Sequence, residues 1–159
     1  KMVMMYRWDP EEALKLIEAE KITSISGVPT MTLEVMRSEK RKNYDLSSLK
    51  ELSGGGAARP SSHVQQLQDE FPNTNPGLGY GLTETNAAGA VISGEEYLLR
   101  PGSTGKPTPP LTEIKIVKED GQQGSRDEVG EVYIKSSTNF RCYWRDKKAN
   151  SNCSSPSKS

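Results

Sequence analysis

Two short apolar runs, each followed by a glycine-containing loop and then by a helical pattern, constrain the fold of this chain most. The run at residues 22–26 is rich in β-branched side chains and is bounded by Gly27 and Pro29, after which apolar residues recur at helical spacing. Leu52 leads in the same way into a run of glycines, and residues 60–71 then repeat apolar side chains at intervals of three and four. The order strand, glycine loop and helix, given twice, predicts an α/β sheet whose loops gather at one edge.

The first helix is predicted to begin directly after Asp9. An aspartate is a good N-cap, Pro10 suits the first helical position, and Glu12 stands three residues after the cap. Further along, Asp45 is expected to cap a short turn that runs to Leu49.

The pattern changes from Pro101 onward. Residues 113–118 and 131–135 alternate between polar and apolar, and a turn is expected at residues 119–121, so these runs predict antiparallel strands with one solvent-facing side. The serine-rich end of the chain has no hydrophobic period. We therefore predict an α/β portion over residues 1–100, a partial β subdomain over residues 101–148 and a disordered tail over residues 149–159.

The stretch GLGYGLTETN, residues 77–86, carries the residue types that a nucleotide site needs. Glycines allow a backbone to approach a ligand closely, and a ring, hydroxyls and a carboxylate offer stacking, hydrogen bonding and metal coordination. That combination suits a nucleotide with its magnesium. The alternative is a glycine-rich turn between a strand and a helix.

Composition excludes several classes of function. The chain has 21 Lys and Arg against 21 Asp and Glu, so no net field favours nucleic acid or an anionic membrane surface. Two cysteines and one histidine, far apart in the sequence, form neither a disulfide scaffold nor a zinc site. No run approaches the roughly 20 apolar residues of a membrane span, and no signal peptide is present, so we expect a soluble protein in a reducing compartment.

Two common phosphate-binding motifs are absent by count. A dinucleotide fingerprint that starts at Gly77 needs glycine at position 82, which is leucine. A phosphate loop that ends at Gly105-Lys106 needs glycine at position 100 and a hydroxyl at position 107, where Arg100 and Pro107 stand. His63, on a predicted amphipathic helix, is interpreted as a surface or packing residue.

Five short segments, in order, resemble the middle of the adenylate-forming acyl-CoA synthetases. They are ISGVPTM at residues 25–31, SGGGA at 53–57, GYGLTET at 79–85, PGSTGKP at 101–107 and GEVYI at 130–134. The resemblance extends over residues 1 to about 150 and implies part of a layered α/β nucleotide-binding domain, followed by the start of a small antiparallel β subdomain.

The resemblance also implies roles for individual residues. Tyr80 matches the aromatic residue on which the family stacks adenine, and Thr83 matches the hydroxyl that binds the α-phosphate. Glu84 matches the carboxylate that holds magnesium. The remaining nucleotide-binding residues implied in this way are Gly54, Gly55, Gly56, Ala57, Gly79 and Gly81, and a wall of the acid-substrate tunnel is implied at Gly27, Val28 and Pro29.

The family's own phosphate loop is expected before residue 1, and its ribose-binding aspartate, hinge and catalytic lysine are expected after residue 150. Cys142 stands where the family usually has glycine before a Tyr-Trp pair. We therefore expect an internal fragment of the large N-terminal domain that is inactive on its own. A cytoplasmic location is favoured, and a mitochondrial or peroxisomal one stays open because the expected N-terminus is missing.

The function that the resemblance implies is ATP-dependent ligation of a carboxylic acid, fatty or aromatic, to CoA. ATP and the acid would give an acyl-adenylate and pyrophosphate, and the CoA thiol would then displace AMP. Two alternatives stay open: another adenylate-forming chemistry, such as amino-acid activation or a luciferase-like oxidation, and a truncated isoform without enzymatic activity. The sequence leaves the length of the acyl chain and the oligomeric state open.

Overall fold

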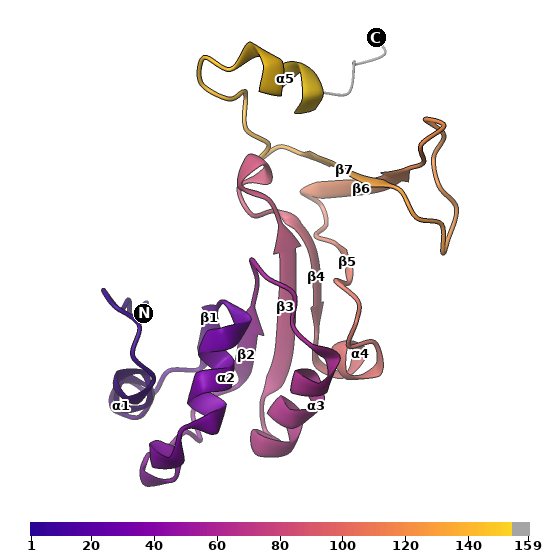
Figure 1. Ribbon diagram of the computed structural model, residues 1–159. Coiled ribbons are helices and arrows are strands. Elements are labelled where there is room, and N and C mark those ends of the chain that lie inside the picture. Colours follow the sequence, from indigo (N-terminus) through magenta and orange to yellow (C-terminus); the bar gives the residue numbers. More distant parts are fainter. Residues whose placement is uncertain (154–159) are drawn as a thin grey trace.

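The structure is a computed structural model and describes residues 1–153 (Figure 1). Its main element is a five-stranded sheet in the order β1-β2-β3-β4-β5, in which β1, β2 and β3 are parallel and β4 and β5 are antiparallel to their neighbours. The predicted α/β class is therefore confirmed as a mixed sheet with helices. The strands of this sheet are β1 (Ser24–Gly27), β2 (Glu51–Gly54), β3 (Asn75–Gly81), β4 (Gly89–Ser93) and β5 (Lys106–Pro107).

The first helix, α1 (Pro10–Glu20), begins where the sequence predicts it. The side chain of Asp9 accepts a 2.8 Å hydrogen bond from the backbone amide of Glu12, which satisfies one of the free amides of the first turn. The helix ends at Lys21, whose backbone adopts the left-handed conformation with φ 49°. Its buried face comprises Ala13, Leu14 and Ile17.

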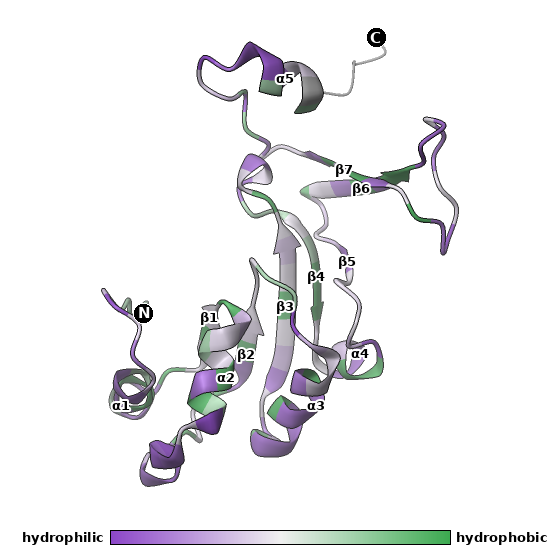
Figure 2. Cartoon of the chain, in the orientation of Figure 1, coloured by the Kyte–Doolittle hydropathy of each residue, from purple (hydrophilic) through white to green (hydrophobic). Residues whose placement is uncertain are grey.

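The helices α2 (Pro29–Arg37) and α3 (Ser61–Glu70) connect successive parallel strands and pack on the same side of the sheet (Figure 1). The short helix α4 (Gly94–Leu99) follows β4 and packs against β3. Hydrophilic residues colour much of α3 and hydrophobic ones much of β4 (Figure 2). The apolar side chains between helices and sheet form two clusters, one built on Leu14, Ile17, Val35, Leu49, Leu52 and Leu67, the other on Val64, Leu78, Ile92 and Tyr97.

In the two glycine-rich stretches, the strands extend over more glycines than the sequence predicts. Gly54 ends β2 rather than opening a loop, and residues 77–81 all belong to β3. The reading of this stretch as a turn is therefore wrong for these five residues. Glycine gives Gly77 room beside the neighbouring strand, because a Cβ atom on it would lie 2.6 Å from Oγ of Ser53.

A second, two-stranded sheet follows, formed by β6 (Thr112–Val117) and β7 (Glu131–Ser136). The strands pair antiparallel in continuous register from Thr112 with Ser136 to Val117 with Glu131, which confirms the two predicted strands. Because β5 pairs with β4, the first sheet extends to Pro107, and the division predicted near residue 100 stays a prediction.

The segment after β7 ends in a helix, α5 (Lys147–Cys153). The carboxylate of Asp146 accepts a 2.9 Å hydrogen bond from the amide of Ala149, and this cap accounts for a helix where the serine-rich composition predicts none. Residues 149–153 therefore depart from the predicted disordered tail, and residues 154–159 lie outside the described residues. Within residues 1–153, none of the helices has the length and apolar character that crossing a membrane requires.

Candidate functional site

The carboxyl ends of β1, β2 and β3 bring three separate glycine segments together. Gly27 pairs with Gly54 in the parallel register of β1 and β2, and the amide of Gly55 donates a 3.0 Å hydrogen bond to the carbonyl of Gly27. Gly55 also forms an isolated parallel bridge to Gly79 on β3. The residues predicted to line the acid tunnel and the nucleotide site thus meet at one edge of the sheet. We call this edge the glycine edge; it comprises Gly27, Gly54, Gly55 and Gly79.

The loop after β2 requires glycine for its conformation and keeps its backbone near the acid-tunnel segment. Gly56 has φ 75°, in the left-handed region that side chains disfavour. A Cβ on Gly56 would lie 4.0 Å from Cγ1 of Val28, whose side chain is exposed. Ala57, the next residue, is also exposed. The loop therefore presents backbone rather than side chains to the space beside Val28.

Beyond β3 the chain makes a tight excursion that carries the predicted phosphate and metal residues. A Cβ on Gly81 would lie 2.2 Å from the carbonyl oxygen of Ala87, so only glycine fits where the two sides of the excursion meet. The 3₁₀ turn η2 (Thr83–Thr85) lies inside it. The buried hydroxyl of Thr85 accepts a 3.1 Å bond from the amide of Leu82 and donates a 2.5 Å bond to the carbonyl of Ala88.

Within this excursion Thr85 is structural, and the preceding side chains are accessible. Thr83 is exposed, and Glu84 and Tyr80 are half-buried. Tyr80 pairs with Ala90 on β4 and stands two residues before Leu82, the N-cap of η2. The structure therefore places Tyr80, Thr83 and Glu84 in succession beyond the glycine edge, and their roles toward a nucleotide stay predictions.

Glu84 is held by residues that sequence reasoning did not identify. The hydroxyl of Tyr143 donates a hydrogen bond to Oε1 of Glu84, and the amide of Phe140 donates a 2.7 Å bond to the carbonyl of Glu84. The hydroxyl of Thr138 donates a 2.7 Å bond to the carbonyl of Thr85. The bond from Tyr143 holds the pKa of Glu84 below its ordinary value and raises the pKa of Tyr143, because it stabilises a charged carboxylate and a protonated phenol.

These three residues follow β7 and lie 53 or more positions from their partners in the sequence. The Tyr-Trp pair after Cys142 marked this segment in the sequence, because it belongs to the pattern that resembles the family. No sequence spacing, however, indicates that Tyr143 contacts Glu84. Cys142 itself is an exposed free thiol.

The oxygen donors at the site fit magnesium better than a softer metal. Glu84 supplies a charged carboxylate and Thr83 an adjacent hydroxyl, and both are hard ligands. Among the described residues no group of three or more His, Cys, Asp and Glu side chains could hold a metal by itself. Magnesium is commonly bound through one or two carboxylates together with substrate phosphates, and the carboxylate of Glu84 would meet that requirement with a nucleotide bound beside it.

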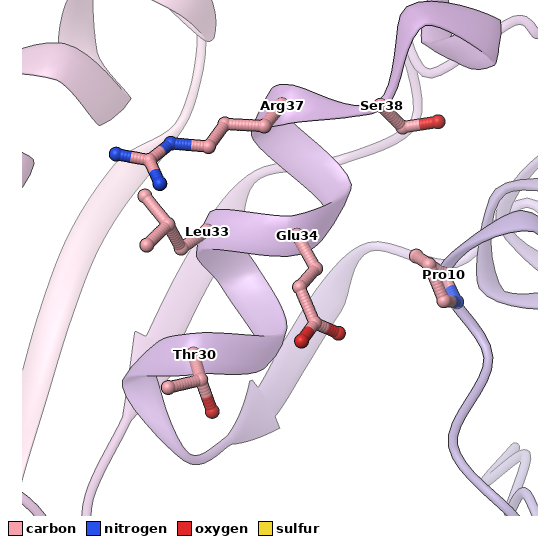
Figure 3. Close-up of a pocket in the computed structure, with 6 residues that line it drawn as sticks. All are labelled: Pro10, Thr30, Leu33, Glu34, Arg37 and Ser38. Atoms are coloured by element: carbon pink, nitrogen blue, oxygen red, sulfur yellow. The ribbon is translucent and has the colours of Figure 1, made fainter.

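Two hollows on the surface differ in their relation to these residues. One lies along α2, and none of the predicted site residues lines it. Figure 3 shows the residues that do: Pro10, Thr30, Leu33, Glu34, Arg37 and Ser38. The other is lined by residues of β1 to β4 and includes Gly54 and Gly79, together with Ser26, Ser53, Gly77 and Val91. The second hollow therefore adjoins the glycine edge.

Known proteins share both the sequence and the fold. Acyl-CoA synthetase 7 of Caenorhabditis elegans is 34% identical to this chain, over 90% of the chain and 26% of its own length. Luciferin 4-monooxygenase of Photuris pensylvanica is 31% identical, over 94% of the chain and 27% of its own length. The crystal structure of the N-terminal domain of FACL13 from Mycobacterium tuberculosis superposes with a TM-score of 0.85 at 25% identity, over 96% of this chain and 38% of that one.

The chain spans about a quarter of the length of these two relatives. The model of the family described as AMP-binding enzyme matches residues 1–144. The matched residues include the glycine edge, the excursion with η2 and the segment that contacts Glu84. The chain therefore belongs to the AMP-binding enzyme family.

Proposed function

We propose that this chain forms the adenylate-binding part of an ATP-dependent acid–CoA ligase. The observation that supports it most is the meeting of Gly27, Gly54, Gly55 and Gly79 at one sheet edge, with Tyr80, Thr83 and Glu84 directly beyond it. An edge with little side-chain bulk admits a flat base and an acyl chain, and the adjacent ring, hydroxyl and carboxylate provide the contacts that a nucleotide needs.

In this proposal each residue acts on a defined part of the ligand. Tyr80 stacks on adenine, the hydroxyl of Thr83 donates to the α-phosphate, and the glycine loop at residues 54–56 borders the base and the acyl group. Gly27, Val28 and Pro29 form one wall of the tunnel for the acid. Magnesium, held by Glu84 together with the phosphates, would offset phosphate charge during attack by the carboxylate.

The acid is proposed to be fatty or aromatic and the acceptor to be CoA. A carboxylate is a poor electrophile, and its conversion to an acyl-adenylate supplies AMP as a leaving group for the thiol. The two exposed free thiols of the chain, at Cys142 and Cys153, agree with a reducing compartment.

Acid-dependent exchange of pyrophosphate into ATP tests the proposal. We expect a longer protein that contains this chain to catalyse the exchange, and we expect the 159-residue chain to remain at background. The second expectation follows because the phosphate loop and the catalytic lysine expected for the family are not among these 159 residues. Loss of each electrostatic contact to a transition state costs about 3 kcal/mol. Exchange by neither protein, with any fatty or aromatic acid, would contradict the ligase proposal, and exchange by the chain alone would contradict the proposed division of roles.

A luciferase-like oxidation is a second candidate, because the luciferin 4-monooxygenase relative matches over the same region. Both chemistries begin with an acyl-adenylate, so the exchange reaction does not separate them. Adding CoA or oxygen to the preformed adenylate does: thioester formation supports the ligase, whereas light emission without thioester supports the oxidation.

A further inference from the structure

The contact between Tyr143 and Glu84 joins the segment after β7 to η2 in the candidate site. The phenol hydroxyl donates to Oε1 of the carboxylate, and 59 residues separate the two in the sequence. Within residues 1–153, Tyr143 is the one side chain that donates a hydrogen bond to this carboxylate, and the backbone amide of Glu84 itself also interacts with it. Oε1 is therefore held by a distant side chain, and no other side chain of the described residues donates to Oε2.

Tyr143 is itself held from two sides. The side chain of Asn150, in α5, accepts a 2.7 Å bond from the amide of Tyr143 and donates a 3.1 Å bond to its carbonyl. The ring of Phe140 packs edge-to-face on the tyrosine ring, with 4.7 Å between centroids and 71° between planes. The phenol is therefore anchored both through its backbone and through its ring.

The same segment also fixes the backbone that carries the carboxylate. The amide of Phe140 binds the carbonyl of Glu84, and the hydroxyl of Thr138 binds the next carbonyl, that of Thr85. A glutamate has three rotatable side-chain bonds, so a fixed backbone alone leaves its carboxylate free to move. The bond from Tyr143 removes that freedom.

We propose that Tyr143 is a positioning residue, which orients the carboxylate of Glu84 so that Oε2 can bind the divalent cation of a nucleotide. The inference rests on the proposed function, in which Glu84 is the metal ligand. Hydrogen bonds to ligating carboxylates orient them, and loss of such a partner typically costs 10 to 100-fold in metal affinity or activity.

A competing role for the same contact predicts the opposite sign. If the phenol occupied the carboxylate and kept the cation out, removing the hydroxyl would strengthen metal binding. Positioning predicts that removing it weakens metal binding. The sign of one affinity change therefore separates the two roles.

The test measures binding of Mn²⁺, in place of Mg²⁺, to the 159-residue chain in the presence of AMP, which chelates Mn²⁺ far more weakly than ATP does. Free Mn²⁺ is read from its paramagnetic resonance signal and compared with the same solution without the chain. We expect Tyr143→Phe, which keeps the ring against Phe140, to weaken Mn²⁺ binding about tenfold. Tyr133→Phe is the matched control, because Tyr133 lies on β7 and its ring packs under Lys115 rather than against Glu84, and it should leave the affinity unchanged. Unchanged or tighter binding in Tyr143→Phe would overturn the inference.

Two further variants keep the outcome decisive. Glu84→Gln should weaken Mn²⁺ binding more than Tyr143→Phe does; if Glu84→Gln has no effect, the metal role in the proposed function fails, whereas an effect in Glu84→Gln alone sinks only the role of Tyr143. Asn150→Ala releases the backbone of Tyr143 without removing the phenol, and we expect it to weaken Mn²⁺ binding in the same direction. This variant decides the question if Tyr143→Phe does not fold, and normal affinity in a folded Asn150→Ala would then contradict the inference.

Discussion

A Cβ atom on Gly55 would lie 3.0 Å from the carbonyl oxygen of Gly79 on the neighbouring strand. The two backbones come this close at the point where β2 ends and β3 continues toward Tyr80. A methyl group here must push apart two main chains rather than a flexible side chain. The glycine edge is therefore fixed by the spacing of its strands.

Replacement of Gly55 by alanine should destabilise the chain by about 1–3 kcal/mol, the usual cost of overpacking. Gly79→Ala is the matched control, since the nearest atom to its Cβ is the carbonyl oxygen of Gly54 at 3.9 Å, an ordinary contact. Urea denaturation of both variants measures the two costs. Equal stability of the two variants would show that the edge relaxes and does not require Gly55.

Replacement of Arg59 by leucine should stabilise the fold. Arg59 is only 6% exposed, and its Nε and Nη1 atoms have no hydrogen-bond partner among the described residues, although Nη2 reaches Thr32 at 3.4 Å. Burial lowers its pKa, which reflects the cost of keeping the charge there. Leaving buried donors unsatisfied costs about 1–3 kcal/mol, and we expect a gain of that order in the free energy of unfolding.

The control for this prediction is Arg37→Leu, at an exposed position of α2. Surface changes of this kind usually alter stability by less than about 0.5 kcal/mol. A loss of stability in Arg59→Leu, beyond that of the control, would mean that the bond to Thr32 and the packing over the Tyr97 ring outweigh the unsatisfied donors.

The contact between Asp45 and Lys21 should make stability depend on pH in the acidic range. Nζ of Lys21 donates a 2.8 Å bond to Asp45, and the amide of Ser47 donates a 3.0 Å bond to the same carboxylate. These bonds lower the pKa of Asp45. The carboxylate therefore stabilises the fold fully above the ordinary aspartate pKa of about 4, and this contribution is lost as pH falls from there toward the lowered pKa of Asp45.

Urea denaturation between about pH 7 and pH 3 should show Asp45→Asn less stable than the parent at neutral pH, with the difference narrowing at acidic pH. In a Lys21→Met background the same substitution should have a smaller effect, because the opposite charge is gone. A difference that stays constant across this pH range would show that the charge of Asp45 contributes nothing.

Local signals in the sequence were enough for much of the fold. The cap at Asp9 and the following proline located α1, and the alternation in residues 113–118 and 131–135 located β6 and β7. The repeated strand, glycine loop and helix gave the α/β class. Each of these features depends on neighbours within a few residues, which the sequence displays directly.

The remaining features depend on contacts between distant segments. Glycine is a poor strand former, so the sequence favoured a turn at residues 77–81; the pairing of β3 with two neighbours overrides that preference. The sequence also placed Glu84 in the site without its partner Tyr143, because a contact across 59 residues leaves no periodic signal. The cap of α5 at Asp146 was missed in a composition typical of disorder.

The central claim is that Tyr80 lies at an adenine site. Its most direct test is the affinity of Tyr80 variants for AMP, measured by calorimetry, with the melting temperature of each variant measured alongside. Tyr80→Phe should retain most of the affinity, since its ring face remains, and Tyr80→Ala should lose about 1–3 kcal/mol of binding free energy. Tyr44→Ala removes a partly buried ring that packs on the hydrophobic cluster of Leu14 and Leu52. This variant should lower the melting temperature and leave AMP affinity unchanged. Unchanged AMP affinity in folded Tyr80→Ala would contradict the claim.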